Sequence, residues 1–132
     1  MRLWLHGSAV ALLLMISAGC TSGLKRPVVT AELEPDAHGV QRVVVNMHSY
    51  YFEPNRIVVR ANHPVELVLK NRAKLIPHNF TIADPHLAVN DGAWLRTGHI
   101  DFTPTTPGSY TFFCHVDHHA NKGMTGTLVV LP

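Results

Sequence analysis

Residues 110–124 read YTFFCHVDHHANKGM, and this stretch carries the strongest indication of what the chain can do. It contains Cys114, two adjacent histidines and Met124, and one further histidine, His78, lies upstream in the sequence PHNF. One thiolate, two imidazoles and one thioether form the donor set of a mononuclear copper electron-transfer site. The sequence therefore predicts such a site, provided that these side chains converge in space.

The period of two along a strand predicts where the first two donors point. His78 lies two residues before Phe80, and Cys114 lies two residues after Phe112, so each donor shares a strand face with an aromatic residue of core type. We therefore expect both donors to face inward at one pole of the fold, if their strands are neighbours. The loop 115–123 is long enough to fold back and bring the remaining donors to the same ion.

The rest of the chain predicts an all-β fold. From residue 40 onward, short β-type runs alternate with turn residues such as the Pro-Gly pair at 107–108. The runs are Gln41–His48, Arg56–Arg60, Val65–Lys70, His78–Ala83, His99–Phe102, Ser109–Cys114 and Gly126–Val130. Helical periodicity is limited to a turn or two within 84–95, and 28–30 suits a short edge strand. About seven to eight strands in 40–132 favour a Greek-key two-sheet β-sandwich.

The N-terminal residues are typical of an export signal. Residues 1–19 combine Arg2, the apolar run 9–16 and small residues before Cys20, which is the layout of a signal peptide. Cys20 after Ala-Gly resembles a bacterial lipoprotein cut site, although Ser17 departs from its usual aliphatic residue, so cleavage without lipidation stays an alternative. We expect an exported protein of the periplasm or cell envelope, anchored to the membrane through Cys20, with 20–39 as a tether.

Charge and cysteine content narrow the classes of partner. Residues 20–132 keep ten of the eleven Lys and Arg residues and all nine Asp and Glu residues, so their formal net charge is near +1. This balance argues against nucleic-acid binding and predicts no strong long-range steering of a charged partner. With Cys20 acylated, no internal disulfide can form, and Cys114 is left as a reactive thiol or a metal ligand.

In their order and spacing, several motifs together resemble the cupredoxins, small type 1 blue copper proteins of the plastocyanin and azurin kind. The motifs are YFEP at 51–54, Asn71, HNF at 78–80, PGSYTFFC at 107–114 and GMTG at 123–126. The resemblance covers nearly all of 40–132. It implies one copper per chain, cycling between Cu(I) and Cu(II), with His78, Cys114 and His119 as equatorial ligands and Met124 as the weak axial ligand.

Two positions near the ligands qualify this assignment. His118 competes with His119 for the copper, although Cys114-x4-His119 is the spacing that the resemblance favours. The resemblance also implies that Asn79 holds the backbone around the cysteine loop by hydrogen bonds. His115 follows the cysteine where many relatives carry a small hydroxylic residue, so the network around Asn79 is expected to differ.

The function expected from this pattern is one-electron transfer without enzymatic activity, by a monomer that docks weakly and transiently to redox partners. The His119 edge is the expected electron port, with Pro77 and Met124 lining the docking surface. A copper trafficking or storage module is the alternative. A catalytic site around His115 is disfavoured because Met124 occupies the axial position, and a binuclear centre would need a second cysteine in the loop. The exposed-type residues His115, Asp117 and His118 are either solvated or an auxiliary metal site.

Overall fold

The structure is a computed structural model of the whole chain, and it describes residues 25–132. The predicted signal peptide and Cys20 lie outside the described residues. Within 25–132, no helix has the length and apolar character needed to cross a membrane. In the same range Cys114 is a free, buried cysteine.

The described residues form ten strands and one 3₁₀ segment. In chain order they are β1 (Thr30–Glu32), β2 (Gln41–His48), β3 (Tyr51–Glu53), β4 (Arg56–Arg60), β5 (Val65–Asn71), β6 (His78–Asp84), β7 (Leu87–Trp94), β8 (Thr97–Phe102), β9 (Gly108–Phe113), η1 (Val116–Lys122) and β10 (Thr125–Leu131).

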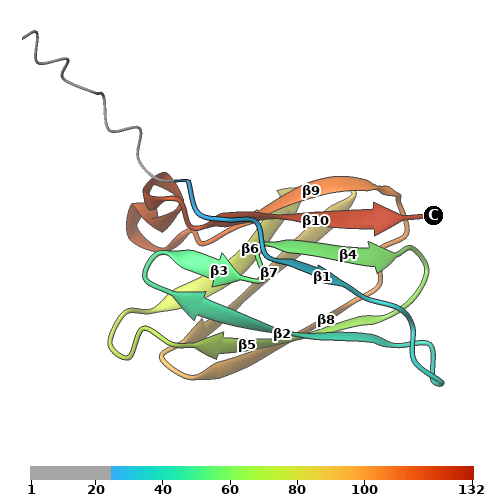
Figure 1. Cartoon of the computed structure of the whole chain (residues 1–132), viewed down its shortest axis with the longest axis horizontal. Helices are drawn as coiled ribbons and strands as arrows, with labels where there is room; N and C mark the ends of the chain where they lie inside the picture. The colour runs from blue at the N-terminus through green and yellow to red at the C-terminus, as the bar shows by residue number, and fades with distance from the viewer. Residues whose placement is uncertain (1–24) are drawn as a thin grey trace, which may run out of the picture.

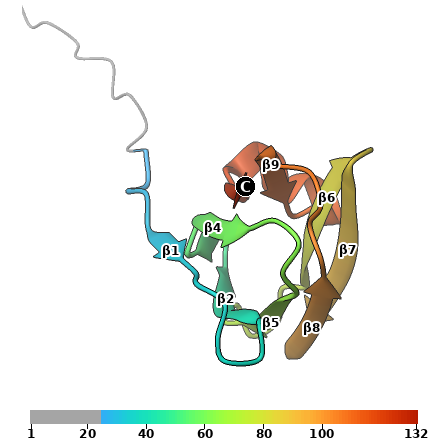
Figure 2. The same cartoon turned by 90° about the vertical axis from the view of Figure 1, so that its right-hand side faces the viewer.

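The strands form two sheets packed face to face (Figures 1 and 2). The larger sheet has the order β1-β4-β10-β9-β6-β7, and the smaller sheet has the order β3-β2-β5-β8. Neighbours that are distant in sequence, such as β2 beside β5 and β4 beside β10, show that the chain crosses between the sheets. The predicted all-β sandwich is confirmed.

The predicted strand count of seven to eight is wrong, because β3 and β7 are additional, whereas the edge strand predicted at 28–30 lies two residues later, as β1. The longest strand that the sequence does not predict is β7. Its sequence LAVNDGAW contains a single β-branched residue and lies in the range where a turn or two of helix is predicted. It is held by antiparallel pairing with β6 along nearly its whole length, from His78–Trp94 to Asp84–Leu87. Tertiary pairing therefore overrides weak local propensity here. Thr30–Glu32, inside the predicted tether, forms β1 and pairs with β4.

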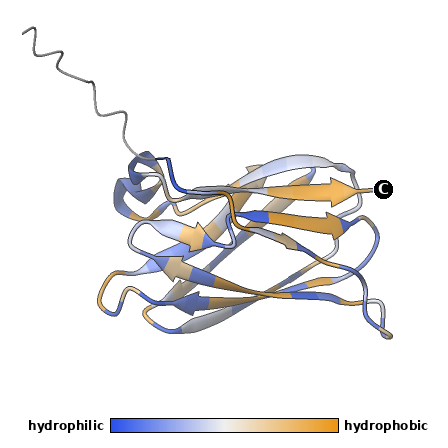
Figure 3. Ribbon diagram, viewed as in Figure 1, coloured by the Kyte–Doolittle hydropathy of each residue, from blue (hydrophilic) through white to orange (hydrophobic). Residues whose placement is uncertain are grey.

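The core lies between the sheets and continues up to the donor residues. Val65, Leu67 and Leu69 are buried, and the residues between them are partly exposed, as the period of two predicts. The hydrophobic end of β10 also contributes to the core (Figure 3). Phe80 stacks on Phe112 with ring centroids 4.5 Å apart. Because Phe112 shares its strand face with Cys114, this aromatic packing supports Cys114 from the core side.

Candidate metal centre

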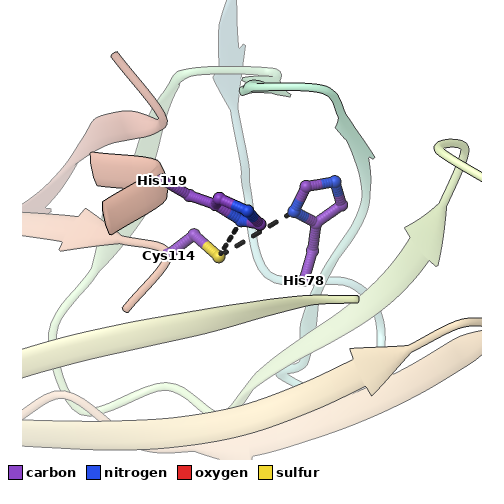
Figure 4. Close-up of side chains that lie close together, drawn as sticks. All are labelled: His78, Cys114 and His119. Atoms are coloured by element: carbon purple, nitrogen blue, oxygen red, sulfur yellow. Dashed lines mark hydrogen bonds between the residues drawn. The ribbon is translucent and has the colours of Figure 1, made fainter. Parts of the chain in front are cut away.

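The structure brings three of the predicted donors together (Figure 4). His78 is the first residue of β6, Cys114 follows the last residue of β9, and His119 lies within η1. One ligand atom from each of the three residues lies within 4.8 Å of the other two. Cys114 Sγ is 3.5 Å from His119 Nδ1 and 3.9 Å from His78 Nδ1. The three side chains therefore face one common point.

The donor cluster is closed to solvent. Cys114, His78 and Met124 are 0% exposed, and His119 is 3% exposed. His78 Nε2 is buried without a hydrogen-bond partner among the described residues. A proton on Nε2 leaves the lone pair on Nδ1, the atom nearer the sulfur, free to bind a metal.

The loop after Cys114 folds so that His119, and not His118, enters the cluster. Asp117 and His118 have positive φ angles of 36° and 56°, which turn the chain between Cys114 and His119. His118 consequently points into solvent, while His119 is buried.

Met124 returns to the cluster through backbone hydrogen bonds. The N–H of Met124 donates to the carbonyl of His119 at 3.2 Å, and the N–H of Cys114 donates to the carbonyl of Met124 at 3.1 Å. The backbone of Met124 is thus held beside that of Cys114 and His119, and its side chain is fully buried. A His78, Cys114, His119 and Met124 cluster of this kind is consistent with one type 1 copper, because thiolate and thioether suit Cu(I) and imidazole suits both oxidation states.

A family comparison agrees with this geometry. The sequence model of the cupredoxin-like domain matches residues 9–130. The chain belongs to the cupredoxin-like family. The match begins upstream of residue 40, the position from which the sequence motifs resemble the family.

Solved structures of similar fold include known copper proteins. Auracyanin A, a "blue" copper protein from the green thermophilic photosynthetic bacterium Chloroflexus aurantiacus, is 20% identical, with a TM-score of 0.59 over 70% of this chain and 100% of that chain. Reduced rusticyanin is 24% identical, with a TM-score of 0.56 over 77% of this chain and 84% of that chain. The metal-binding domain of the Streptococcus pneumoniae D39 Cu(I)-exporting P-type ATPase CopA, solved with Cu(I), is 16% identical, with a TM-score of 0.59 over 81% and 100%. At these identities the likeness concerns the fold.

In this cupredoxin, Asn79 joins β6 to the cysteine loop. Its backbone N–H donates to Cys114 Sγ at 3.5 Å, and its side-chain Oδ1 accepts from the N–H of His115 at 2.9 Å. The second bond is of the kind that the resemblance to the cupredoxins implies for this asparagine. Hydrogen bonds to a ligand sulfur and to its neighbouring backbone orient the ligand and tune the metal.

His115 extends this network in a way that a small hydroxylic residue could not. Asn79 Nδ2 lies 2.6 Å from His115 Nδ1, and Thr81 Oγ1 lies 3.0 Å from the same nitrogen. Asn79 Nδ2 also donates to Thr81 Oγ1 at 3.1 Å, and Thr81 Oγ1 donates to Asn90 Oδ1 at 3.0 Å. His115 is an exposed residue, but its ring is therefore anchored to β6, and through Thr81 and Asn90 to β7.

The pKa values of the two histidines suit metal binding. Burial lowers the pKa of His78 to about 4, and the nearby charges of His119 and His48 act in the same direction. Burial also lowers the pKa of His119, with a further decrease from Lys122 and a small opposing effect from Asp117. Both imidazoles are thus neutral at pH 7, the form in which histidine binds a metal.

Tyr50 covers the cluster, a role that the sequence did not reveal. Its ring lies 4.7 Å from the His119 ring and 6.3 Å, edge-on, from the His78 ring. Lys122 Nζ lies 4.2 Å from the centroid of the Tyr50 ring. The prediction that Met124 lines a docking surface is wrong, because this side chain is fully buried. The only sequence signal for Tyr50 is its place directly before the YFEP motif.

Proposed function

We propose that this cupredoxin is a one-electron carrier, not an enzyme, that works through a single type 1 copper held by His78, Cys114, His119 and Met124. The observation that carries the proposal is the convergence of one thiolate and two imidazoles within 4.8 Å in a site closed to solvent. A copper ion bound there would supply the redox chemistry, by alternating between Cu(I) and Cu(II).

The protein's contribution is to hold the donors still and to exclude water. His78 belongs to β6 and Cys114 directly follows β9, and these two strands pair with Thr81 opposite Phe113 and Ile82 opposite Phe112. Cys114, His119 and Met124 are tied to one another through backbone hydrogen bonds. A donor set fixed in this way moves little when an electron arrives or leaves, so the reorganisation cost of the transfer stays small.

The test is a spectrum of the full chain loaded with Cu(II). We expect an intense visible sulfur-to-copper absorption band and a copper paramagnetic-resonance signal with the narrow hyperfine splitting of a type 1 site. Cys114→Ala must abolish the band, whereas His118→Ala, the neighbouring exposed histidine, must leave it in place. A colourless protein with bound Cu(II) would refute the proposed carrier site.

A second candidate function is copper delivery or storage. The fold similarity to the Cu(I)-bound CopA domain and the exposed loop histidine His118 support it. The two functions differ in metal exchange. A carrier keeps its copper through many redox cycles in the presence of a Cu(I) chelator, whereas a delivery protein loses it to the chelator. Burial of all four donors favours the carrier.

Export and membrane attachment through Cys20 form part of the proposal, and they rest on the sequence of residues 1–20. A lipid anchor would hold the domain at the outer face of a bacterial membrane, where it would meet its redox partners. Metabolic labelling with a fatty acid tests this placement. The label must enter the wild-type chain and must be absent from Cys20→Ala.

A further inference from the structure

The formal charges of this protein are segregated along its long axis. One end of the molecule carries the donors (left in Figure 1). We call the chain segments at this end the metal-end loops; they are residues 25–29, 49–50, 72–77, 94–96 and 114–124, and they include Trp94, the last residue of β7. They contain six of the ten Lys and Arg residues in 25–132, and only Asp117 of the nine acidic residues. The six are Lys25, Arg26, Arg72, Lys74, Arg96 and Lys122. The net charge near +1 is therefore the sum of a positive metal end and a negative rest of the described chain.

The positive charges at this end are not neutralised by ion pairs. Among residues 25–132, Arg42 pairs with Asp36 and Glu66, and Arg60 pairs with Glu34. These pairs lie away from the metal-end loops, at the opposite end or along the strands. The basic groups of the metal-end loops make no salt bridge within the described chain. They are therefore free to attract an acidic surface.

The same loops expose most of the large apolar side chains on the described surface. Leu75 is 86% exposed, Trp94 is 65% exposed and Leu95 is 50% exposed. Of the other exposed large hydrophobic residues, Val28 and Val29 also belong to these loops, and Val44 lies elsewhere. Asn71 Nδ2 donates to the carbonyl of Ile76 at 2.8 Å and to the carbonyl of Trp94, which joins the loop of Leu75 to the loop of Leu95.

This apolar patch adjoins the donor cluster. Trp94 is the strand partner of His78 in the pairing of β6 with β7. Lys74 and Arg96 come from the two loops that carry the patch, and Lys122 lies over Tyr50 on the side of His119. Apolar contact area flanked by unpaired positive charge is suited to short-lived complexes, in which charge guides the approach and a small apolar area makes the contact.

We propose that the metal-end loops dock an acidic protein, one that carries carboxylates around its own redox group. The inference deepens the proposed function, because electron transfer falls steeply with distance and this face lies nearest to the donors. Opposite charge at the two ends of the molecule would also orient an acidic partner before contact, with the metal end toward it. The net charge alone predicts no strong long-range steering of a charged partner, whereas the distribution of the charges predicts that an acidic partner is steered.

The binding test uses the metal-free full chain, so that it does not depend on copper. The probe is an oxidised plant-type [2Fe–2S] ferredoxin, an acidic redox protein, titrated into the ¹⁵N-labelled chain at about 10 mM ionic strength, where charges act over about 30 Å. We expect amide shifts confined to the metal-end loops, and loss of binding at about 150 mM salt. Shifts centred on another face, or binding that salt does not weaken, would overturn the inference.

Two double variants with the same change in net charge provide the matched comparison. Lys74→Gln/Arg96→Gln removes two positive charges from the metal-end loops. Thr105→Glu/Ser109→Glu adds two negative charges at exposed positions before and at the start of β9, at the opposite end. We expect the first variant to bind the ferredoxin about tenfold more weakly and the second to change binding less than twofold. Equal effects of the two variants would contradict docking at this face.

Copper-loaded chain then reports on the electron transfer. Reduced ferredoxin gives one electron to Cu(II), which yields oxidised ferredoxin and Cu(I), and no bond or proton changes place. The second-order rate must follow the same order as the affinities, and Leu75→Ser must lower it at every salt concentration. If the visible band is absent but the metal-free chain still binds the ferredoxin, the carrier function fails and the docking face stands.

Vesicles of phosphatidylglycerol test whether the metal-end loops bind an anionic lipid surface instead of an acidic protein. If sedimentation with these vesicles falls in Lys74→Gln/Arg96→Gln and not in Thr105→Glu/Ser109→Glu, while ferredoxin affinity is the same in both, the face binds anionic lipid. That result would overturn the protein partner.

Discussion

Gly126→Ala should damage the support of the metal site through a single added methyl group. A Cβ at Gly126 would lie 2.2 Å and 2.3 Å from two ring atoms of Phe112, and 2.6 Å from the backbone carbonyl oxygen of Asn55. Phe112 is fully buried, with its ring stacked on Phe80 at 4.5 Å and against Phe52 at 5.2 Å. The ring can therefore move only by displacing two other rings, and the carbonyl belongs to the backbone.

The cost follows from two opposing effects. Overfilling a packed core costs typically about 1–3 kcal/mol, and a double clash with a ring and a backbone atom belongs at the upper end of that range. Replacing glycine by alanine inside a strand returns roughly 0.5–1 kcal/mol of conformational entropy. We therefore expect Gly126→Ala to lower the free energy of unfolding by about 2 kcal/mol, measured by urea denaturation of the metal-free chain.

Two further variants separate the clash from other effects of the methyl group. Phe112→Leu removes the two ring atoms that the new methyl group would meet, so the double variant with Gly126→Ala should be more stable than the sum of the two single changes predicts. Gly123→Ala is the control, because nothing lies within 4 Å of its Cβ position and its φ of 96° makes the cost one of backbone strain alone. Additive effects at Gly126 and Phe112, or a loss below about 0.5 kcal/mol for Gly126→Ala, would refute the reasoning.

Three other predictions concern the donor cluster. The metal-free chain should lose up to about 3 kcal/mol of stability as the pH falls from 6.5 to about 4, because unfolded His78 takes up a proton in this range and folded His78 does not. Urea denaturation at pH 7 and at pH 4.5 measures this loss, and His78→Gln must reduce it. Asn79→Ala leaves the N–H of His115 unpaired and removes one of the two partners of its ring Nδ1, so it should cost about 1–2 kcal/mol and shift the reduction potential measured by voltammetry, whereas Asn90→Ala should leave the potential nearly unchanged. Tyr50→Leu should expose His119 and speed the removal of copper by a chelator, and an unchanged rate, or an equal effect of Tyr51→Leu, would contradict the covering role of Tyr50.

The sequence predicts those parts of the fold in which local pattern and burial agree. The run Val65–Lys70 alternates as a strand with one inward face, and β5 has that burial pattern. In β7 the alternation of buried and exposed residues is regular only over Leu87–Asn90, so the strand depends on its pairing with β6 more than on its own propensity. Long-range pairing is therefore the information that a reading of short windows lacks.

The donor site divides in the same way. His78 and Cys114 follow from strand parity, which is a local property. The choice between His118 and His119 depends on positive φ angles at Asp117 and His118. Asp and His adopt such angles more often than most residues other than glycine, but still too rarely for the sequence to predict them at these positions. The cover by Tyr50 and the segregation of charge depend on which loops meet at one end, so they become visible only when the strands are assembled.

The geometry of the site depends on two parts of the chain whose pairing is short. Cys114, His119 and Met124 belong to one unit, β9, η1 and β10, in which backbone bonds fix the three residues relative to one another. His78 belongs to β6, and β6 is paired with β9 at two positions, of which Thr81–Phe113 is the nearer to the cluster. Beyond that pair, β6 is joined to the cysteine loop by side-chain contacts: the N–H of Asn79 donates to Cys114 Sγ, its Oδ1 accepts from the N–H of His115, and Thr81 Oγ1 lies 3.0 Å from His115 Nδ1. We therefore expect Asn79, which is not one of the proposed ligands, to influence the distance between the two parts and the reduction potential of the copper-loaded chain.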